Sequence, residues 1–253
     1  MGPRLRWLRA DLHIHTALSP CASREMTPPL IVRTALEAGL DMIAVSDHNT
    51  AGNVAAVQQA AEAAGGGLTV LPGIEITSVE EVHVLGLFPD VPAAESVAAR
   101  LRTMLPAADE QYYSFFGEQP LLTADGRVAG SEAVALAAAS SLDLTETVDL
   151  VHSLGGLAIA AHVDRGAFSV FSQLGFFPKN AAFDGVETSR RLGSGSPLLE
   201  ALATRDLLVT ASSDAHFLED IGTDSTELRV LEPTFAELVL AFAGAGERSV
   251  ARA

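Results

Sequence analysis

A chain of 253 residues is long enough for one large α/β domain, because α/β barrels of this length are usually a single unit. The formal net charge of −16 repels polyanions, which argues against a long nucleic-acid groove and against an anionic membrane as partner. Cys21 is the only cysteine, so an intrachain disulfide and a thiolate cluster are excluded, and a reducing, cytoplasmic setting fits best. Residues 1–9 lack the apolar segment of a secretory signal, and no run approaches the length of a membrane span.

Short apolar runs rich in β-branched residues alternate with longer alanine-rich runs of helical period, which predicts βα units around a parallel sheet or barrel. We expect seven strands, at residues 9–15, 42–46, 68–74, 82–88, 157–162, 183–187 and 207–213. Helices are expected at residues 28–38, 52–64, 93–105, 131–139, 145–154, 197–204 and 234–243. A further edge strand is a candidate at residues 228–231.

No internal repeat or low-complexity linker divides the chain, so residues 1–253 are predicted to form a single domain with one insertion, at residues 106–127. The insertion carries the aromatic cluster Tyr112, Tyr113, Phe115 and Phe116. A segment of this length in a compact domain is either disordered or a lid over a site. Disordered segments are usually poor in aromatic residues, which favours the lid.

The first strand presents two histidines on the same side. Positions i and i+2 of a β-strand face the same way, so His13 and His15 can hold one metal ion. Alone the pair is a weak signal, because imidazoles often form ordinary hydrogen bonds in a core. It gains weight because every later strand-like run ends in another ligand-type residue.

These further residues are Asp47, His48, Glu75, His83, His162, Asp214 and His216. The functional groups of parallel α/β barrels lie at the C-terminal ends of strands, so most of them should converge on one mouth. Each has a structural alternative: the aspartates could cap the following helices, Glu75 could be solvated, and any one histidine could be a core residue. Six of the seven histidines, however, fall at or next to strand ends, and only His152 lies within a helix.

The donor atoms are imidazole nitrogens and carboxylate oxygens, a set that suits zinc, manganese or iron. There are too many of them for one ion. We therefore expect two or three divalent metal ions bridged by a carboxylate. Such a cluster activates a water molecule and holds the attacking and leaving oxygens of a phosphoryl transfer.

The ligand-type residues fall into short motifs along most of the chain: Asp11-Leu12-His13-Ile14-His15-Thr16, Ala44-Val45-Ser46-Asp47-His48-Asn49, Pro72-Gly73-Ile74-Glu75, Ala161-His162 and Ser213-Asp214-Ala215-His216. In these motifs and their order the chain resembles the PHP family, named for its polymerase and histidinol phosphatase members. The resemblance implies a distorted (β/α)7 barrel, a dinuclear or trinuclear metal site, and phosphoester hydrolysis as the usual activity. It is closest to a subgroup of small stand-alone metal-dependent phosphoesterases.

The resemblance also implies how the ligands are shared. One ion would be held by His13, His15, Glu75 and Asp214. Glu75 would bridge to a second ion, completed by His83 and His162. A third ion would be held by His48 and His216 together with a carboxylate from the loop after the first motif.

That carboxylate is where the chain departs from the family. The aspartate of the usual Ser-Asp-Gly is missing, and Ser19-Pro20-Cys21 stands in its place. Glu25 is the nearest replacement and could reach back to the same ion, or it could merely favour the positive end of the following helix. Cys21 is the less favoured candidate, because its soft thiolate suits zinc and is mismatched with manganese.

The predicted function is hydrolysis of a phosphate ester of a small metabolite or nucleotide by a metal-activated water. Asp214, His48 and His216 are the candidate catalytic residues, and either histidine could protonate the leaving group. Arg165 is the preferred contact for the substrate phosphate, with Arg190 and Arg191 as alternatives. Two alternatives are a non-catalytic metal-binding module and a nuclease acting on short oligonucleotides.

Overall fold

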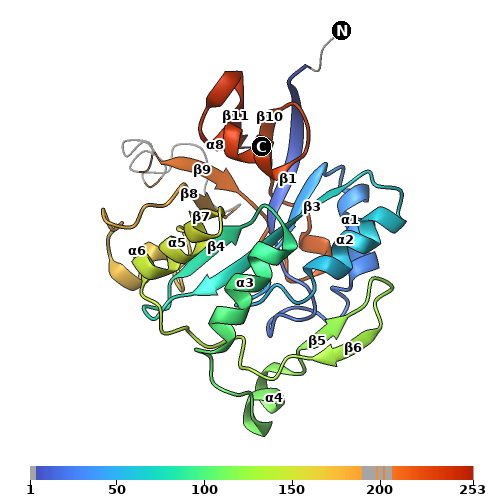
Figure 1. Cartoon of the computed structure of the whole chain (residues 1–253), viewed down its shortest axis with the longest axis vertical. Helices are drawn as coiled ribbons and strands as arrows, with labels where there is room; N and C mark the ends of the chain where they lie inside the picture. Colours follow the sequence, from blue (N-terminus) through green and yellow to red (C-terminus); the bar gives the residue numbers. More distant parts are fainter. Residues whose placement is uncertain (1–3, 190–197, 199–201, 203–206, 253) are drawn as a thin grey trace.

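The computed structural model describes residues 4–189, 198, 202 and 207–252 (Figure 1). Its strands are β1 Arg6–Ile14, β2 Met42–Val45, β3 Thr69–Thr77, β4 His83–Leu87, β5 Pro120–Leu122, β6 Val128–Ser131, β7 Leu157–Ala160, β8 Gly185–Thr188, β9 Leu208–Ala211, β10 Thr226–Val230 and β11 Ser249–Arg252. The α-helices are α1 Pro28–Glu37, α2 Val54–Ala63, α3 Val91–Arg102, α4 Glu110–Phe116, α5 Leu144–Ser153, α6 Val170–Leu174 and α8 Phe235–Phe242. Two short 3-10 helices lie at Leu218–Asp220 and Ala245–Glu247.

All seven expected strands belong to one curved, nine-stranded sheet in the order β11-β10-β1-β2-β3-β4-β7-β8-β9. The fold is therefore the distorted α/β barrel that the sequence predicts. The expectation of a parallel sheet is wrong for β4, which runs antiparallel to both β3 and β7. Only residues 78–82 connect β3 to β4, and a parallel connection needs a crossover of a dozen residues or more.

The candidate edge strand at 228–231 is confirmed as part of β10, but it is not at an edge. It pairs antiparallel with β1 on one side and β11 on the other. Beyond β9 the chain returns to β1, where Ala215 accepts a hydrogen bond from the His15 N–H and donates one to the His13 carbonyl. These bonds close the sheet into a barrel at the edge where the ligand-type residues lie.

Five of the expected helices are confirmed as α1, α2, α3, α5 and α8, and the one at 197–204 falls mostly outside the described residues. The helix expected at 131–139 is wrong. Its backbone groups are engaged by side chains from elsewhere: the Asn49 amide donates to the carbonyls of Leu136 and Ala138, and the Gln119 amide donates to that of Val134. These tertiary hydrogen bonds override the helix propensity of an alanine-rich segment.

The sheet has an apolar cluster on each face. Residues of α1, α2, α3 and α5 pack on the outer face, whereas the inner face is filled by strand residues together with Leu238 and Ala241 of α8. In β1, Leu12 packs with the inner cluster and Ile14 with the outer one, and the pairing of β1 with β2 shifts register between Asp11 and Ile14. An irregularity of this kind re-aims side chains, and here it turns His13 inward beside Leu12.

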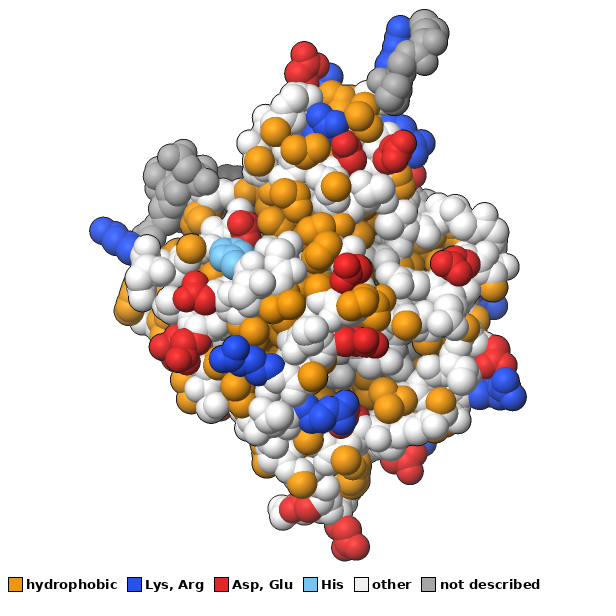
Figure 2. Space-filling view, viewed as in Figure 1, with side chains coloured by type: hydrophobic (Ala, Val, Ile, Leu, Met, Phe, Trp, Pro, Cys, Tyr) orange, Lys and Arg blue, Asp and Glu red, His pale blue; other side chains and the backbone are white. Residues whose placement is uncertain are grey.

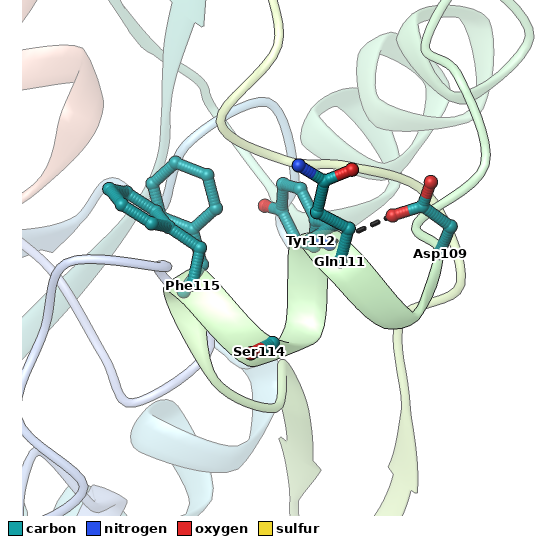
Figure 3. Close-up of a pocket in the computed structure, with 6 residues that line it drawn as sticks. Asp109, Gln111, Tyr112, Ser114 and Phe115 are labelled. Atoms are coloured by element: carbon teal, nitrogen blue, oxygen red, sulfur yellow. Dashed lines mark hydrogen bonds between the residues drawn. The ribbon is translucent and has the colours of Figure 1, made fainter.

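The segment predicted as an insertion is ordered around α4 and the β5–β6 hairpin. Asp109 caps α4 by accepting a hydrogen bond from the Tyr112 N–H at 2.8 Å, and the hollow beside this helix contains no histidine (Figure 3). Phe115 of α4 is 81% exposed. The role of residues 106–127 as a lid stays a prediction. Among the described residues, no helix combines the length and apolarity needed to cross a bilayer.

Gly73 allows β2 and β3 to approach closely beneath the site. A Cβ atom there would lie 2.6 Å from Ser46 Oγ and 2.9 Å from the Val45 carbonyl oxygen. We expect Gly73→Ala to lower the free energy of unfolding by about 1–3 kcal/mol, as overpacking in a core does. Denaturant unfolding measures this, with exposed Gly67→Ala as the control, because an added Cβ there meets only Leu36 at 3.6 Å. Equal stabilities of the two variants would contradict the close approach.

Candidate metal centre

The predicted ligands meet in one cleft of about 780 Å³ at the mouth of the barrel. Its lining includes Cys21, His48, Glu75, His83, His162, Arg165, Asp214 and His216. His13 and His15 lie beneath it and are fully buried. His83 opens its strand rather than closing it, yet it reaches the same mouth because β4 is antiparallel, so that His83 pairs with Thr77 at the C-terminal end of β3.

Glu75 lies at the centre of the cluster and is 1% exposed. Its Oε1 is 2.7 Å from His83 Nδ1 and 3.0 Å from His162 Nε2. Its Oε2 is 3.0 Å from His48 Nδ1 and 3.4 Å from the Nε2 atoms of both His13 and His15. The two oxygens thus face different sets of imidazoles, which is the arrangement required of a bridging carboxylate.

His13, His15, Glu75 and Asp214 form the first of three groups of donor atoms. Asp214 Oδ1 lies 3.4 Å from His13 Nε2 and 3.0 Å from His15 Nε2. Donors about 2.0–2.2 Å from one ion are separated from each other by about 3.0–3.5 Å in tetrahedral or octahedral coordination. The four donors are therefore spaced like ligands of a single ion.

Outer hydrogen bonds fix which nitrogen of each imidazole faces the cluster. His13 Nδ1 is 3.0 Å from Glu187 Oε1, and His15 Nδ1 is 2.8 Å from Ser19 Oγ, which itself donates to Asp47. His216 Nδ1 lies 2.8 Å from the carbonyl oxygen of Asp214. A proton on each Nδ1 leaves the Nε2 lone pair free, as metal-ligating histidines require.

The other two groups are His48 with Glu75 and His83, and His15 with His48 and His216. The family resemblance implied that His83 and His162 complete a second ion. Both histidines contact Glu75 Oε1, but His162 is in none of the three groups found among the described residues. His162 Nδ1 is buried without a hydrogen-bond partner. The three groups thus hold seven of the nine predicted ligands, and His162 lies beside them through its contact with Glu75.

The residues fit divalent metal ions. His13 Nε2 and Glu75 Oε2 are buried without a hydrogen-bond partner, and an unsatisfied buried polar group is costly unless a ligand satisfies it. The two atoms lie 3.4 Å from each other, and His13 Nε2 lies at the same distance from Asp214 Oδ1. The nitrogen and oxygen donors are those that zinc, manganese and iron accept.

Burial opposes the charged form of every group here, and the neighbouring charges decide the outcome. Burial lowers the pKa of both His15 and His48. Contacts with Glu75 and Asp214 nonetheless raise the pKa of His15 to about 9. Contact with Glu75 likewise raises the pKa of His48 to about 9. Burial dominates at His83 and His216, lowering the pKa to about 4 and about 3. Facing imidazoles outweigh burial at Glu75 and hold its pKa well below the usual range. Ion binding would therefore displace protons from some imidazoles and find others already neutral.

Backbone strain is concentrated at the cleft. His162, Phe168 and Asp214 have φ angles of 27°, 57° and 48°, and Asn49, next to His48, has 54°. Left-handed backbone is uncommon for residues other than glycine, and such residues cluster at functional sites because the surrounding structure holds them in place.

One predicted ligand is not part of the cluster. Glu25 is exposed, and it belongs to none of the donor groups found in the described part of the chain. Cys21 is closer, with Sγ 3.3 Å from His48 Nε2. Arg190 and Arg191 lie outside the described residues. Arg165 lines the cleft and forms an ion pair with Asp214 Oδ2 at 2.5 Å.

Sequence reasoning missed the outer residues that hold the ligands. Glu187 ends the expected strand 183–187, so its position at a strand end was a signal that could have identified it. Asp47 was expected as a ligand-type residue with helix capping as its alternative, whereas it accepts hydrogen bonds from the N–H and hydroxyl of Thr16 and from Ser19. It thereby fixes the loop that follows His15.

Replacing Glu187 with glutamine should weaken metal binding, because His13 loses a charged partner behind its Nδ1. We expect Glu187→Gln to lower the affinity for zinc by about 10- to 100-fold, the usual effect of removing an outer partner of a ligand. Calorimetric titration of the metal-free protein measures this. Glu237→Gln is the control, since Glu237 pairs with Arg248 away from the cleft. Equal zinc affinities would remove Glu187 from this role.

Solved structures share this fold. The lesion-specific endonuclease PfuEndoQ from Pyrococcus furiosus superposes with a TM-score of 0.73 at 19% identity, covering 97% of this chain and 58% of that chain. A proposed metal-dependent phosphoesterase from Bifidobacterium adolescentis has a TM-score of 0.57 at 24% identity, covering 82% of this chain and 87% of that one. At these identities the likeness concerns the fold.

Sequence comparisons identify the family. The 5'-3' exoribonuclease Rnm of Escherichia coli strain K12 is 33% identical over 84 residues, which are 32% of this chain and 28% of that protein. The match thus spans less than a third of Rnm. A family model described as PHP-associated matches residues 199–243. The PHP domain model matches residues 11–170, which is more than half of the chain, and the protein therefore belongs to the PHP domain family.

Proposed function

We propose that the protein is a metal-dependent phosphoesterase that hydrolyses a phosphate ester of a nucleotide or another small metabolite. The observation that carries the proposal is the position of Glu75, whose two oxygens face separate sets of metal-ligating imidazoles in one open cleft. Two or three ions held this closely suit the chemistry of phosphoryl transfer. A non-catalytic module would have no need for a cleft beside its metal ligands.

Bound divalent ions, with zinc, manganese and iron as candidates, would activate water and neutralise charge on the phosphate. The protein's own groups then have separate tasks. Asp214 directs Oδ1 toward His13 and His15 while Oδ2 is held by Arg165. His48 and His216 reach the same cleft, and an imidazole that does not hold an ion would protonate the leaving oxygen.

Arg165 supports the choice of a phosphate ester as substrate. Its side chain is 44% exposed, and it is the one lysine or arginine among the described residues that line the cleft. Nη1 pairs with Asp214 Oδ2, and the exposed part of the guanidinium would be within reach of a phosphate oxygen in the cleft. Arginine suits this task because its planar donors match the geometry of phosphate.

The cleft also favours a small substrate with a planar ring. Its volume of about 780 Å³ lies within the usual range for small-ligand sites. Phe168 and Phe217 line it with side chains that are 43% and 48% exposed. Phe168 stacks on His83 at a centroid distance of 4.7 Å, which places an aromatic face beside the candidate metal ligands. Exposed rings in this position can stack on a base.

A nuclease acting on short oligonucleotides is the second candidate, because the comparisons include a named exoribonuclease and a named endonuclease. A long duplex is disfavoured. Binding along a nucleic-acid backbone relies on many Lys and Arg contacts to phosphates. On the face shown in Figure 2 the basic side chains are separated from one another. A short strand that enters the cleft by one end would need few such contacts.

Hydrolysis assays with metal-free protein and added zinc or manganese test the proposal. The substrates would be p-nitrophenyl phosphate, its bis-ester, mononucleotides, sugar phosphates and short oligonucleotides. We expect metal-dependent turnover that Asp214→Asn lowers by at least about 100-fold, since even outer partners of a ligand contribute about 10- to 100-fold. The same loss in the Glu237→Gln control, or no turnover with any metal, would contradict the proposal.

The ring at the mouth gives a separate prediction. Phe217→Ala should raise KM for mononucleotides by about 5- to 150-fold, because stacking of a base on an aromatic ring contributes about 1–3 kcal/mol. KM for sugar phosphates should stay unchanged. Phe115→Ala is the matched control, since Phe115 is an exposed phenylalanine that does not line the cleft. A parallel rise for both substrate classes would show that Phe217 does not select for a ring.

A further inference from the structure

Asn53 is a buried asparagine that joins the insertion to the loop after the first strand. It is the N-cap residue of α2 and is 0% exposed. Its Nδ2 donates a hydrogen bond to Thr16 Oγ1 at 2.9 Å and another to the Pro120 carbonyl oxygen at 3.2 Å. Its Oδ1 accepts the N–H of Leu122 at 2.8 Å. Asn53 thus uses both donor hydrogens and the acceptor oxygen of its amide to hold the two segments together.

Thr16 connects Asn53 to a buried carboxylate. The Thr16 hydroxyl donates to Asp47 Oδ2 at 2.7 Å, and the Thr16 N–H donates to Asp47 Oδ1 at the same distance. A hydroxyl has one hydrogen, and here that hydrogen is committed to Asp47. The Thr16 oxygen can therefore only accept from position 53, so the side chain there must be a donor.

Ser19 connects the same carboxylate to two candidate metal ligands. Its hydroxyl donates to Asp47 Oδ1 at 2.7 Å, so its oxygen serves its other neighbours only as an acceptor. These neighbours are the His48 N–H at 3.2 Å and His15 Nδ1 at 2.8 Å. The proton of a neutral His15 is thereby placed on Nδ1, which leaves Nε2 for a metal ion. Hydrogen bonds therefore connect the insertion to the ligands in the order Leu122, Asn53, Thr16, Asp47, Ser19, and then His15 and His48.

Close packing joins the same segments. A Cβ atom on Gly52 would lie 2.6 Å from Leu121 Cδ2 and 3.0 Å from Leu18 Cδ2, so both leucines lie against the backbone next to Asn53. Leu18 is fully buried, and Leu121 packs against the small apolar cluster to which Leu18 belongs. Because packed interiors yield little, a displacement of the β5–β6 hairpin would be transmitted to the loop after His15.

We propose that Asn53 is a positioning residue for the metal centre, through which the insertion holds His15 and His48 in place. Each of the three donor groups contains His15, His48 or both, so a shift of these two imidazoles would reach every group. Asn53 acts through Thr16 rather than by ligation, and the insertion serves as a support for the ligands. Its effect on hydrolysis rests on the proposed function, whereas its effect on metal affinity does not.

Zinc titration of the metal-free protein tests the connection. Asn53→Ala and Thr16→Val each break it and should lower the affinity for zinc by about 5- to 10-fold, less than the roughly 10- to 100-fold typical of a partner in direct contact with a ligand. Gln58→Ala is the matched control, because it removes another amide of α2, one that donates to the Val70 carbonyl outside the lining of the cleft. Unchanged zinc affinity in Asn53→Ala, or an equal loss in Gln58→Ala, would overturn the proposal.

The double variant Asn53→Ala with Thr16→Val separates positioning from a general loss of stability. If Asn53 acts through Thr16, the double variant should bind zinc no more weakly than the weaker of the two single variants, whereas independent effects add in free energy. Thr16→Ser retains the hydroxyl and should bind zinc like the wild-type protein. Additive losses, or a Thr16→Ser variant as weak as Thr16→Val, would contradict a role that runs through this hydroxyl.

The coupling must also act in reverse, because linkage between two sites is reciprocal. Saturating zinc should slow hydrogen exchange of the Leu122 N–H in the wild-type protein, and this effect should be much smaller in Thr16→Val, where the bond of Leu122 to Asn53 is kept. The Ala158 N–H, which donates to Asp184, is the internal control and should be protected alike in both proteins. Equal protection of Leu122 in both would show that the insertion is not coupled to the ligands. These readouts report metal binding, so a failure to hydrolyse phosphate esters would contradict the proposed function and leave them unaffected.

Discussion

The buried carboxylate of Glu75 is the constraint on which the rest of the site depends. Five imidazoles lie within 3.4 Å of its two oxygens, and the side chain is 1% exposed. One carboxylate cannot neutralise five protonated imidazoles, and neutral imidazoles leave buried lone pairs without donors. Divalent ions resolve this conflict, because they satisfy the lone pairs and provide positive charge without protons.

The fold satisfies this constraint through its departures from a regular barrel. The antiparallel β4 brings the start of one strand beside the end of another, which places His83 opposite Glu75 Oε1. The irregularity in β1 turns His13 inward, and the chain after β9 returns to β1 to place Asp214. Left-handed backbone at His162 and Asp214 completes the arrangement. Each local irregularity thus serves to bring one more donor to the same point.

Much of this could be predicted from the sequence, because strand ends and ligand-type residues are both local patterns. All seven strands and the convergence of most ligands on one mouth followed from those patterns. The direction of β4 could have been predicted only by comparing the length of the β3–β4 connection with the dozen or more residues that a parallel crossover needs. The false helix at 131–139 depended on side chains such as Asn49 and Gln119, whose reach across the fold no local pattern reveals. The positions of Glu25 and Cys21 likewise depend on the path of one loop, and neither residue belongs to a donor group in the described part of the chain.

The charge of the site explains why bound metal, rather than the protein surface, would govern affinity for a phosphate. The first donor group contributes two carboxylates, and Glu187 stands directly behind His13. One divalent ion only neutralises the two ligating carboxylates, so an anionic substrate would still meet no net attraction there. Further ions held mainly by imidazoles, together with Arg165, would make the cleft positive in a protein of net charge −16. Because such a positive field would be confined to the cleft, a compact phosphate ester would gain its full benefit, whereas the distal phosphates of a long polyanion would face an acidic surface.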